Sequence, residues 1–174
     1  MDRLEELEKA SGKKIFTILQ LRMHPSIIAL KEKIINLNSS DKYEIILTYI
    51  TPRGPWYLQS WKGDISKSGG IATNIGIHFF DILIWIFGTV VKSEVYFSKP
   101  KKMSGFLELK KANIRWYLST DVNDLQSGSH AIRKITIDGE KIDFSSGFTN
   151  LHTKVYENIF QGKGYGIKEA KPSI

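Results

Sequence analysis

The chain has 174 residues, of which 41% are hydrophobic and 25% charged, and this composition is typical of one globular domain with a sizeable core. It has no cysteine, which excludes disulfides and cysteine-ligated metals and is compatible with a cytoplasmic location. The formal charge of +7 favours anionic partners. The basic residues are dispersed, however, and no Lys/Arg run exceeds two residues, so nucleic-acid binding is kept only as an alternative.

The first third of the chain alternates helical and β patterns. Residues 2–10 have helical spacing with Leu4 and Leu7 facing inward, and Gly12 follows as a stop signal. Residues 15–21 are apolar and β-branched and predict a buried strand. Pro25 is suited to the first turn of a helix over 26–37, and residues 43–50 predict another strand. The charged N-terminus predicts no signal peptide.

Residues 51–64 are irregular, because two prolines and two glycines interrupt any regular helix. Arg53 and Trp56 lie in this segment. One interpretation is a surface loop with a partly buried tryptophan. The other is a ligand clamp, in which Arg53 binds a phosphate or carboxylate and Trp56 stacks on a planar or sugar ring.

Residues 71–87 predict a helix that is apolar on nearly every side, ended by Gly88. Asn74, His78 and Asp81 interrupt it at i, i+4 and i+7, which places them in one stripe of roughly 60° on an α-helix. Gly76 faces the opposite side, where another element can approach closely. The segment is shorter than the roughly 20 residues of a membrane span and contains Asp81, so a buried helix is expected.

The remainder of the chain is mostly β. Strands are predicted over 90–98, 105–110, 113–119, 131–138 and 141–145, with hairpin turns at 111–112 and 138–140, and a last helix over 149–161. Arg115, Tyr117 and Ser119 alternate with apolar residues, which predicts one core face and one amphipathic face that suits a subunit interface. The fold class is therefore α+β, with a largely antiparallel or mixed open sheet and helices on one face, in one domain over 1–174.

The motifs of several enzyme classes are absent. The sequence has no Gly-x-Ser-x-Gly, no P-loop, and no Gly-x-Gly-x-x-Gly between a strand and a helix, so this chain alone contains no dinucleotide-binding (Rossmann) fold. No further His or Glu lies near His78 and Asp81 to complete a metal site, so no metal is expected. Proton transfer by His78 fits better, with Asn74 orienting a hydroxyl substrate. The alternative is a core histidine bonded to a backbone carbonyl.

At residues 69–88 the sequence resembles the signature helix of the Gfo/Idh/MocA oxidoreductases, in which Gly-Gly precedes Asp-x-Gly-x-His-x-x-Asp and an aromatic-Gly ending. The motifs Gln20-Leu21-Arg22-Met23-His24-Pro25 and Thr51-Pro52-Arg53-Gly54-Pro55-Trp56 resemble the WlbA/WbpB-type branch. So do Gly147-Phe148-Thr149-Asn150 and Ala170-Lys171-Pro172-Ser173-Ile174. The resemblance covers essentially the whole chain.

The resemblance implies a C-terminal substrate domain that follows a Rossmann domain for NAD and a Glu-Lys-Pro motif with a catalytic lysine. By it, His78 is the catalytic histidine beside the reacting hydroxyl, and Asn74, Arg53 and Trp56 bind the UDP-sugar. Asn74 stands where many relatives have Asp, which weakens the idea of an Asp–His pair. Arg22 and His24 lie toward the cofactor, and for both an ion pair or a helix cap is the alternative.

The implied activity is NAD-dependent oxidation of the 3-hydroxyl of UDP-N-acetyl-2-amino-2-deoxy-D-glucuronate, for bacterial surface polysaccharide synthesis in the cytoplasm. The chain alone is expected to be inactive, because hydride transfer needs the cofactor domain. A homodimer or homotetramer through the sheet face is expected. The alternative function is a self-associating scaffold domain that binds no ligand.

Overall fold

We describe a computed structural model of the chain over residues 1–37, 41–142 and 147–174. Within these ranges six strands form one sheet in the order β2-β3-β4-β1-β5-β6. The strands are β1 (Tyr43–Ile50), β2 (Val90–Lys99), β3 (Lys102–Leu109), β4 (Ala112–Ser119), β5 (Ile132–Ile137) and β6 (Glu140–Ile142). The helices are α1 (Asp2–Ser11), α2 (Pro25–Asn36), α3 (Pro55–Gln59), α4 (Ile65–Ser68), α5 (Ile77–Phe87), α6 (Leu151–Phe160) and α7 (Ile167–Ala170). Short 3₁₀ turns are η1 (Gln20–Met23), η3 (Val122–Asp124) and η4 (Lys171–Ser173), and η2 (Ala72–Gly76) is a π-helical turn.

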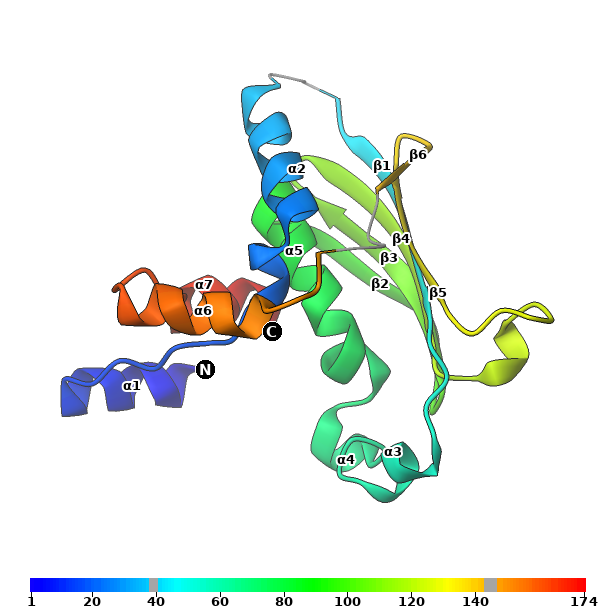
Figure 1. Cartoon of the computed structure of the whole chain (residues 1–174), viewed down its shortest axis with the longest axis horizontal. Helices are drawn as coiled ribbons and strands as arrows, with labels where there is room; N and C mark the ends of the chain where they lie inside the picture. The colour runs from blue at the N-terminus through cyan, green and yellow to red at the C-terminus, as the bar shows by residue number, and fades with distance from the viewer. Residues whose placement is uncertain (38–40, 143–146) are drawn as a thin grey trace.

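The sheet is mixed and open. The central strands β1 and β4 run parallel, and the other neighbouring strands pair antiparallel. Helices α2 and α5 lie on one face of the sheet, whereas α1 lies apart from the sheet near the C-terminal helices (Figure 1). The predicted fold class, α+β with an open mixed sheet and helices on one face, is confirmed.

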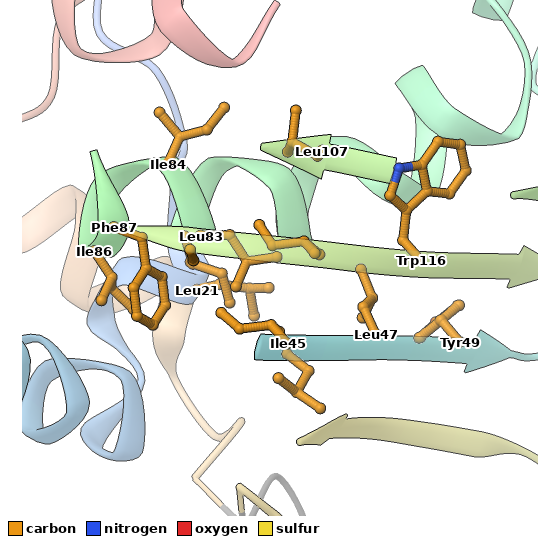
Figure 2. Close-up of a cluster of buried hydrophobic side chains, with 14 of the residues drawn as sticks. Leu21, Ile45, Leu47, Tyr49, Leu83, Ile84, Ile86, Phe87, Leu107 and Trp116 are labelled. Carbon is orange, nitrogen blue, oxygen red and sulfur yellow. The ribbon is translucent and has the colours of Figure 1, made fainter. Parts of the chain in front are cut away.

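The core lies between α5 and the central strands. Figure 2 shows Leu83 and Phe87 of α5 among Ile45, Leu47 and Trp116 of β1 and β4. Each of these side chains is at most 5% exposed, and burial of apolar surface contributes the main stabilising free energy of such a layer. The alternation predicted for 113–119 is confirmed, since Ile114, Trp116 and Leu118 are buried on this face.

Local turn chemistry explains several boundaries. Gly88 ends α5 with φ 93, a backbone conformation that favours glycine. The β5–β6 hairpin turns at Asp138 and Gly139, which both have positive φ, as a type I′ turn requires. Both features agree with the sequence-based prediction. The end of the strand predicted over 141–145 lies partly outside the described residues.

Two predictions in the N-terminal region are wrong. Residues 15–21 form no strand of the sheet; their β contact is an isolated bridge between Phe16 and Gly166. The apolar run instead packs beside the C-terminal segment and turns into η1, from which Leu21 enters the core. Leu4 and Leu7 do not face inward, because α1 buries none of its residues.

The helix predicted over 71–87 is not a continuous α-helix. Its first part, η2, is a π-helical turn, and the α-helical geometry begins at Ile77. Gly76 is buried there against β4, and a Cβ added at this position would lie 2.7 Å from Leu118 Cδ1. The predicted close approach at Gly76 is therefore confirmed. Because a π turn holds more residues than an α turn, Asn74 leaves the straight stripe expected with His78 and Asp81.

Candidate active site

A cavity of about 500 Å³ opens where η2 and α5 meet the core face of β1 and β5. The segment 53–62 covers one side of the cavity, and α6 contributes to the other. Its lining contains Gln20, Leu47, Tyr49, Arg53, Trp56, Tyr57, Lys62, Asn74, His78, Phe79, Arg133, Ile135, Phe148 and His152. Such a hollow, lined by apolar and aromatic side chains together with several polar and charged ones, is typical of a small-molecule site.

The four residues predicted for catalysis and substrate binding line this one cavity: Arg53, Trp56, Asn74 and His78. They come from two segments that are about twenty residues apart in the chain. The prediction that Arg53 and the polar stripe share one cleft therefore holds for Asn74 and His78 but not for Asp81, which does not line this cavity. The chemical role of each residue remains a prediction.

Arg53 and Trp56 lie on the segment that follows β1. The Arg53 Nη2 atom donates a hydrogen bond of 3.5 Å to the Tyr49 hydroxyl, and its guanidinium lies 6.0 Å from the Tyr57 ring centroid. No carboxylate pairs with Arg53 in the described residues. Trp56 is 58% exposed, so its indole face is accessible to a ring. Both side chains are thus available to an anionic ligand with a planar group.

Asn74 is held by its amide nitrogen. Its Nδ2 donates to the Tyr57 hydroxyl at 3.0 Å and to the Lys62 carbonyl at 3.3 Å, which ties η2 to the segment that covers the cavity. Its Oδ1 has no hydrogen-bond partner within the described ranges. A buried or half-buried carbonyl oxygen of this kind is a ready acceptor for a ligand hydroxyl.

His78 is exposed to the cavity and does not bond to a backbone carbonyl, so the core-histidine interpretation is wrong. Its Nδ1 lies 3.4 Å from Gln20 Nε2. Desolvation in the cavity wall lowers the pKa of His78 below 6.5; Asp81 opposes this shift, and His152 adds to it. The imidazole is therefore neutral at pH 7. His78 also lines a second, mostly apolar cavity of about 260 Å³ on the side of η1 and η4.

The sequence analysis did not single out Arg133 and Lys62 as site residues. Arg133 of β5 shares the core face of its strand with Ile135, and its guanidinium lies 6.0 Å from the Tyr49 ring centroid. Lys62 lines the same cavity from the segment after α3. With Arg53 and Lys134 they give the cavity lining four cationic side chains, and a cavity of one sign of charge concentrates ligands of the other.

Arg22 lies outside the lining of the main cavity and is 3% exposed. Its Nε and Nη2 atoms donate to the two carboxylate oxygens of Asp81 at 2.9 and 2.6 Å, and Nη2 also donates to the Glu169 carbonyl. His24 is buried and caps α2, because its Nδ1 accepts from the Ser26 N–H at 3.2 Å. The ion pair and the helix cap given as alternatives for Arg22 and His24 are what the structure shows.

Within residues 1–37, 41–142 and 147–174, no three His, Asp or Glu side chains gather as they would to hold a metal ion. The same part of the chain contains no helix long and apolar enough to cross a bilayer.

Residues 42–126 match the family model described as the oxidoreductase family, C-terminal alpha/beta domain (Gfo/Idh/MocA). This stretch contains β1 to β4 and the four predicted site residues, Arg53, Trp56, Asn74 and His78. The match therefore covers the central part of the sheet together with the helix that carries His78.

The solved structures of the WlbA (WbpB) dehydrogenase from Thermus thermophilus are similar over 99% of this chain. One, in complex with NAD and alpha-ketoglutarate, has 46% sequence identity and a TM-score of 0.92. Another, with NAD and UDP-GlcNAcA, has 45% identity and a TM-score of 0.90. The chain spans 57% and 56% of the length of those chains. The Bordetella pertussis WlbA dehydrogenase, with 18% identity and a TM-score of 0.78 over 99% of this chain and 61% of its own, shares the fold.

Proposed function

We propose, from the premise that this chain belongs to the Gfo/Idh/MocA oxidoreductase family, that it is the substrate domain of an NAD-dependent sugar-nucleotide dehydrogenase. The substrate is UDP-N-acetyl-2-amino-2-deoxy-D-glucuronate (UDP-GlcNAcA), oxidised at its 3-hydroxyl for bacterial surface polysaccharide synthesis. One observation carries the proposal: Arg53, Trp56, Asn74 and His78 line a single cavity together with three further cationic side chains, Lys62, Arg133 and Lys134.

The cationic side of the cavity suits the charges of this ligand. UDP-GlcNAcA has a diphosphate and a uronate carboxylate, and Arg53, Lys62 and Arg133 offer positive charge to both. Arginine binds phosphate and carboxylate oxygens through paired N–H groups, which gives orientation as well as affinity. The exposed indole of Trp56 provides a stacking surface for the uracil or a sugar ring.

The polar end of the cavity suits the reacting hydroxyl. Asn74 presents an unengaged carbonyl oxygen and His78 a neutral imidazole, one turn apart on η2 and α5. Together they can accept from and donate to neighbouring sugar hydroxyls. Holding the alcohol in a fixed orientation is the contribution that this domain makes to the oxidation.

NAD is proposed to be held mainly by a domain other than this one. A dinucleotide site of the Rossmann type needs parallel βαβ units with a glycine-rich turn, and the described sheet has one parallel pair and no such turn. When bound, NAD supplies the hydride acceptor for the carbon that carries the hydroxyl. The isolated chain is therefore proposed to bind the sugar nucleotide without oxidising it.

Isothermal titration of UDP-GlcNAcA into the chain tests the proposal. Arg53→Gln and Arg133→Gln are each expected to weaken binding by about ten- to a hundredfold, because a charge-assisted hydrogen bond contributes about 1.5–3 kcal/mol. Arg3→Gln is the matched control, since Arg3 is exposed on α1, pairs only with Glu6 in the described residues and lies outside the cavity lining. No heat at millimolar ligand with wild-type protein would instead favour the scaffold function.

Self-association is proposed through the sheet face that the helices leave open. Strand register places Phe106, Arg115 and Ile46 in one row and Phe97 and Tyr117 in the next on this face. Ile46 is 51% exposed, and the Phe97 and Tyr117 rings lie 6.2 Å apart. Sedimentation equilibrium is expected to show a dimer or tetramer that Ile46→Lys dissociates. An oligomer unaffected by that change would place the interface elsewhere.

A further inference from the structure

The hydrogen bond between Gln20 and His78 bears on how the histidine works. Gln20 belongs to η1, which precedes α2, whereas His78 lies in the first turn of α5. Their side chains meet at the wall of the main cavity, with Gln20 Nε2 3.4 Å from His78 Nδ1. The contact joins segments that are 58 residues apart in the chain, so tertiary packing must hold it.

A buried ion pair fixes the two elements against each other. Arg22, two residues after Gln20, donates two hydrogen bonds to Asp81, three residues after His78. Ser173 of η4 donates a further hydrogen bond of 3.0 Å to the same carboxylate. Both members of the ion pair are 3% exposed. The ends of η1 and α5 that carry Gln20 and His78 are therefore held on a rigid support.

The partners available to the imidazole determine its tautomer. As the side chains lie, Gln20 turns its amide nitrogen, which can only donate, toward His78 Nδ1 at 3.4 Å, and this arrangement favours Nδ1 as the acceptor. A neutral imidazole then carries its proton on Nε2. The Asp81 oxygens are engaged by Arg22 and Ser173, and no other hydrogen bond reaches the His78 ring in the described residues.

We propose that Gln20 is a positioning residue that fixes His78 as its Nε2–H tautomer, so that His78 presents a hydrogen-bond donor to an oxygen bound in the cavity. This inference rests on the proposed function only for the identity of that oxygen. His78 then stabilises a hydroxyl or carbonyl oxygen of the sugar by donation. In this state its Nε2 already carries a proton and cannot accept the hydroxyl proton.

Long-range ¹H–¹⁵N correlation spectra of the imidazole rings test the inference without any ligand. The chain has four histidines, so His78→Gln identifies the signals of His78. Wild type is expected to show a protonated Nε2 and an unprotonated Nδ1. Gln20→Glu replaces the donor by a carboxylate acceptor, and the proton is expected to move to Nδ1. Gln20→Leu is expected to leave a mixture of the two tautomers.

Gln161→Glu is the matched control, because it makes the same charge change at an exposed position outside the main cavity and its spectrum is expected to stay wild-type. A protonated Nδ1 in wild type, or identical His78 signals in wild type and Gln20→Leu, would overturn the inference. Because the spectra need no sugar nucleotide, such a result leaves the binding proposal standing. Conversely, if the chain shows the expected tautomer but binds no UDP-GlcNAcA, only the proposed function is contradicted.

Discussion

Removing one partner of the Arg22–Asp81 ion pair should destabilise the domain more than any change of an exposed charge. Asp81→Asn keeps the size of the side chain but leaves the Arg22 guanidinium with 3% exposure and no balancing charge. Burying a charge without its partner is unfavourable, because the low-polarity interior solvates it poorly. The variant tests whether this ion pair is the support on which η1 and α5 are held.

The magnitude follows from burial. Breaking a buried pair destabilises a protein by about 3–5 kcal/mol, which for a domain of this size lowers the melting temperature by about 6–20 °C. Arg22→Met leaves the Asp81 carboxylate buried and unpaired, and a similar loss is expected. In the double variant neither charge remains, so the combined loss should be smaller than the sum by about 1–3 kcal/mol.

Urea denaturation followed by circular dichroism gives the free energies of unfolding for the four proteins of this cycle. Asp64→Asn is the control, since Asp64 pairs with Lys67 at 3.4 Å on the surface and asparagine caps a helix equally well. It should leave the midpoint nearly unchanged. If the double variant lost as much free energy of unfolding as the two single variants together, the ion pair would be shown not to couple Arg22 and Asp81. It could then not be what holds η1 against α5.

Three further outcomes are expected. Gly76→Leu should lower the free energy of unfolding by about 1–3 kcal/mol, because a Cβ added at position 76 would already lie 2.7 Å from Leu118 Cδ1. Urea titration checks this against Ala29→Leu, a control at an exposed position. By NMR titration the pKa of His78 should lie below 6.5, fall further in Asp81→Asn and rise in His152→Asn. Because folding lowers the pKa of His78, the stability that neutral His78 contributes should be fully present above about pH 6.5, and it should be lost as the pH falls through the pKa of His78 in the folded state. A pH dependence of the free energy of unfolding that His78→Gln leaves unchanged would contradict this.

Local sequence patterns predicted the strands around the core well. The segment 43–50 matches β1 at both ends, because its β-branched and aromatic residues alternate between a buried and an exposed face as a strand requires. The Asp138-Gly139 turn follows from backbone conformations that few residue types adopt. Where a residue's own chemistry dictates the backbone, the sequence is sufficient.

Long-range partners decided the features that the sequence did not reveal. Residues 15–21 have the composition of a strand, yet they join neither edge of the sheet, and Phe16 forms an isolated bridge with Gly166 instead. Arg133 lies in an ordinary strand pattern, and it reaches the cavity only because β5 pairs antiparallel with β1. Gln20 meets His78 only through the folded position of η1.

The π-helical turn η2 is a third feature that the sequence did not predict. Periodicity at 100° per residue predicted Asn74, His78 and Asp81 in one line, which would place all three in the same site. The structure groups them differently: Asn74 of η2 and His78 of α5 line the main cavity, whereas Asp81 of α5 binds Arg22 outside that lining. A single glycine packed against β4 gives no sequence signal strong enough to predict such a turn.

The most direct test of the central claim is side-chain NMR of the chain titrated with UDP-GlcNAcA. Trp56 is the tryptophan that lines the cavity in the described residues, so its indole N–H should shift together with the Asn74 amide and the His78 imidazole. The indole signals of Trp85 and Trp116 should stay in place. Shifts confined to residues outside this cavity, or none at saturating ligand, would contradict the assignment of this cavity as the sugar-nucleotide site.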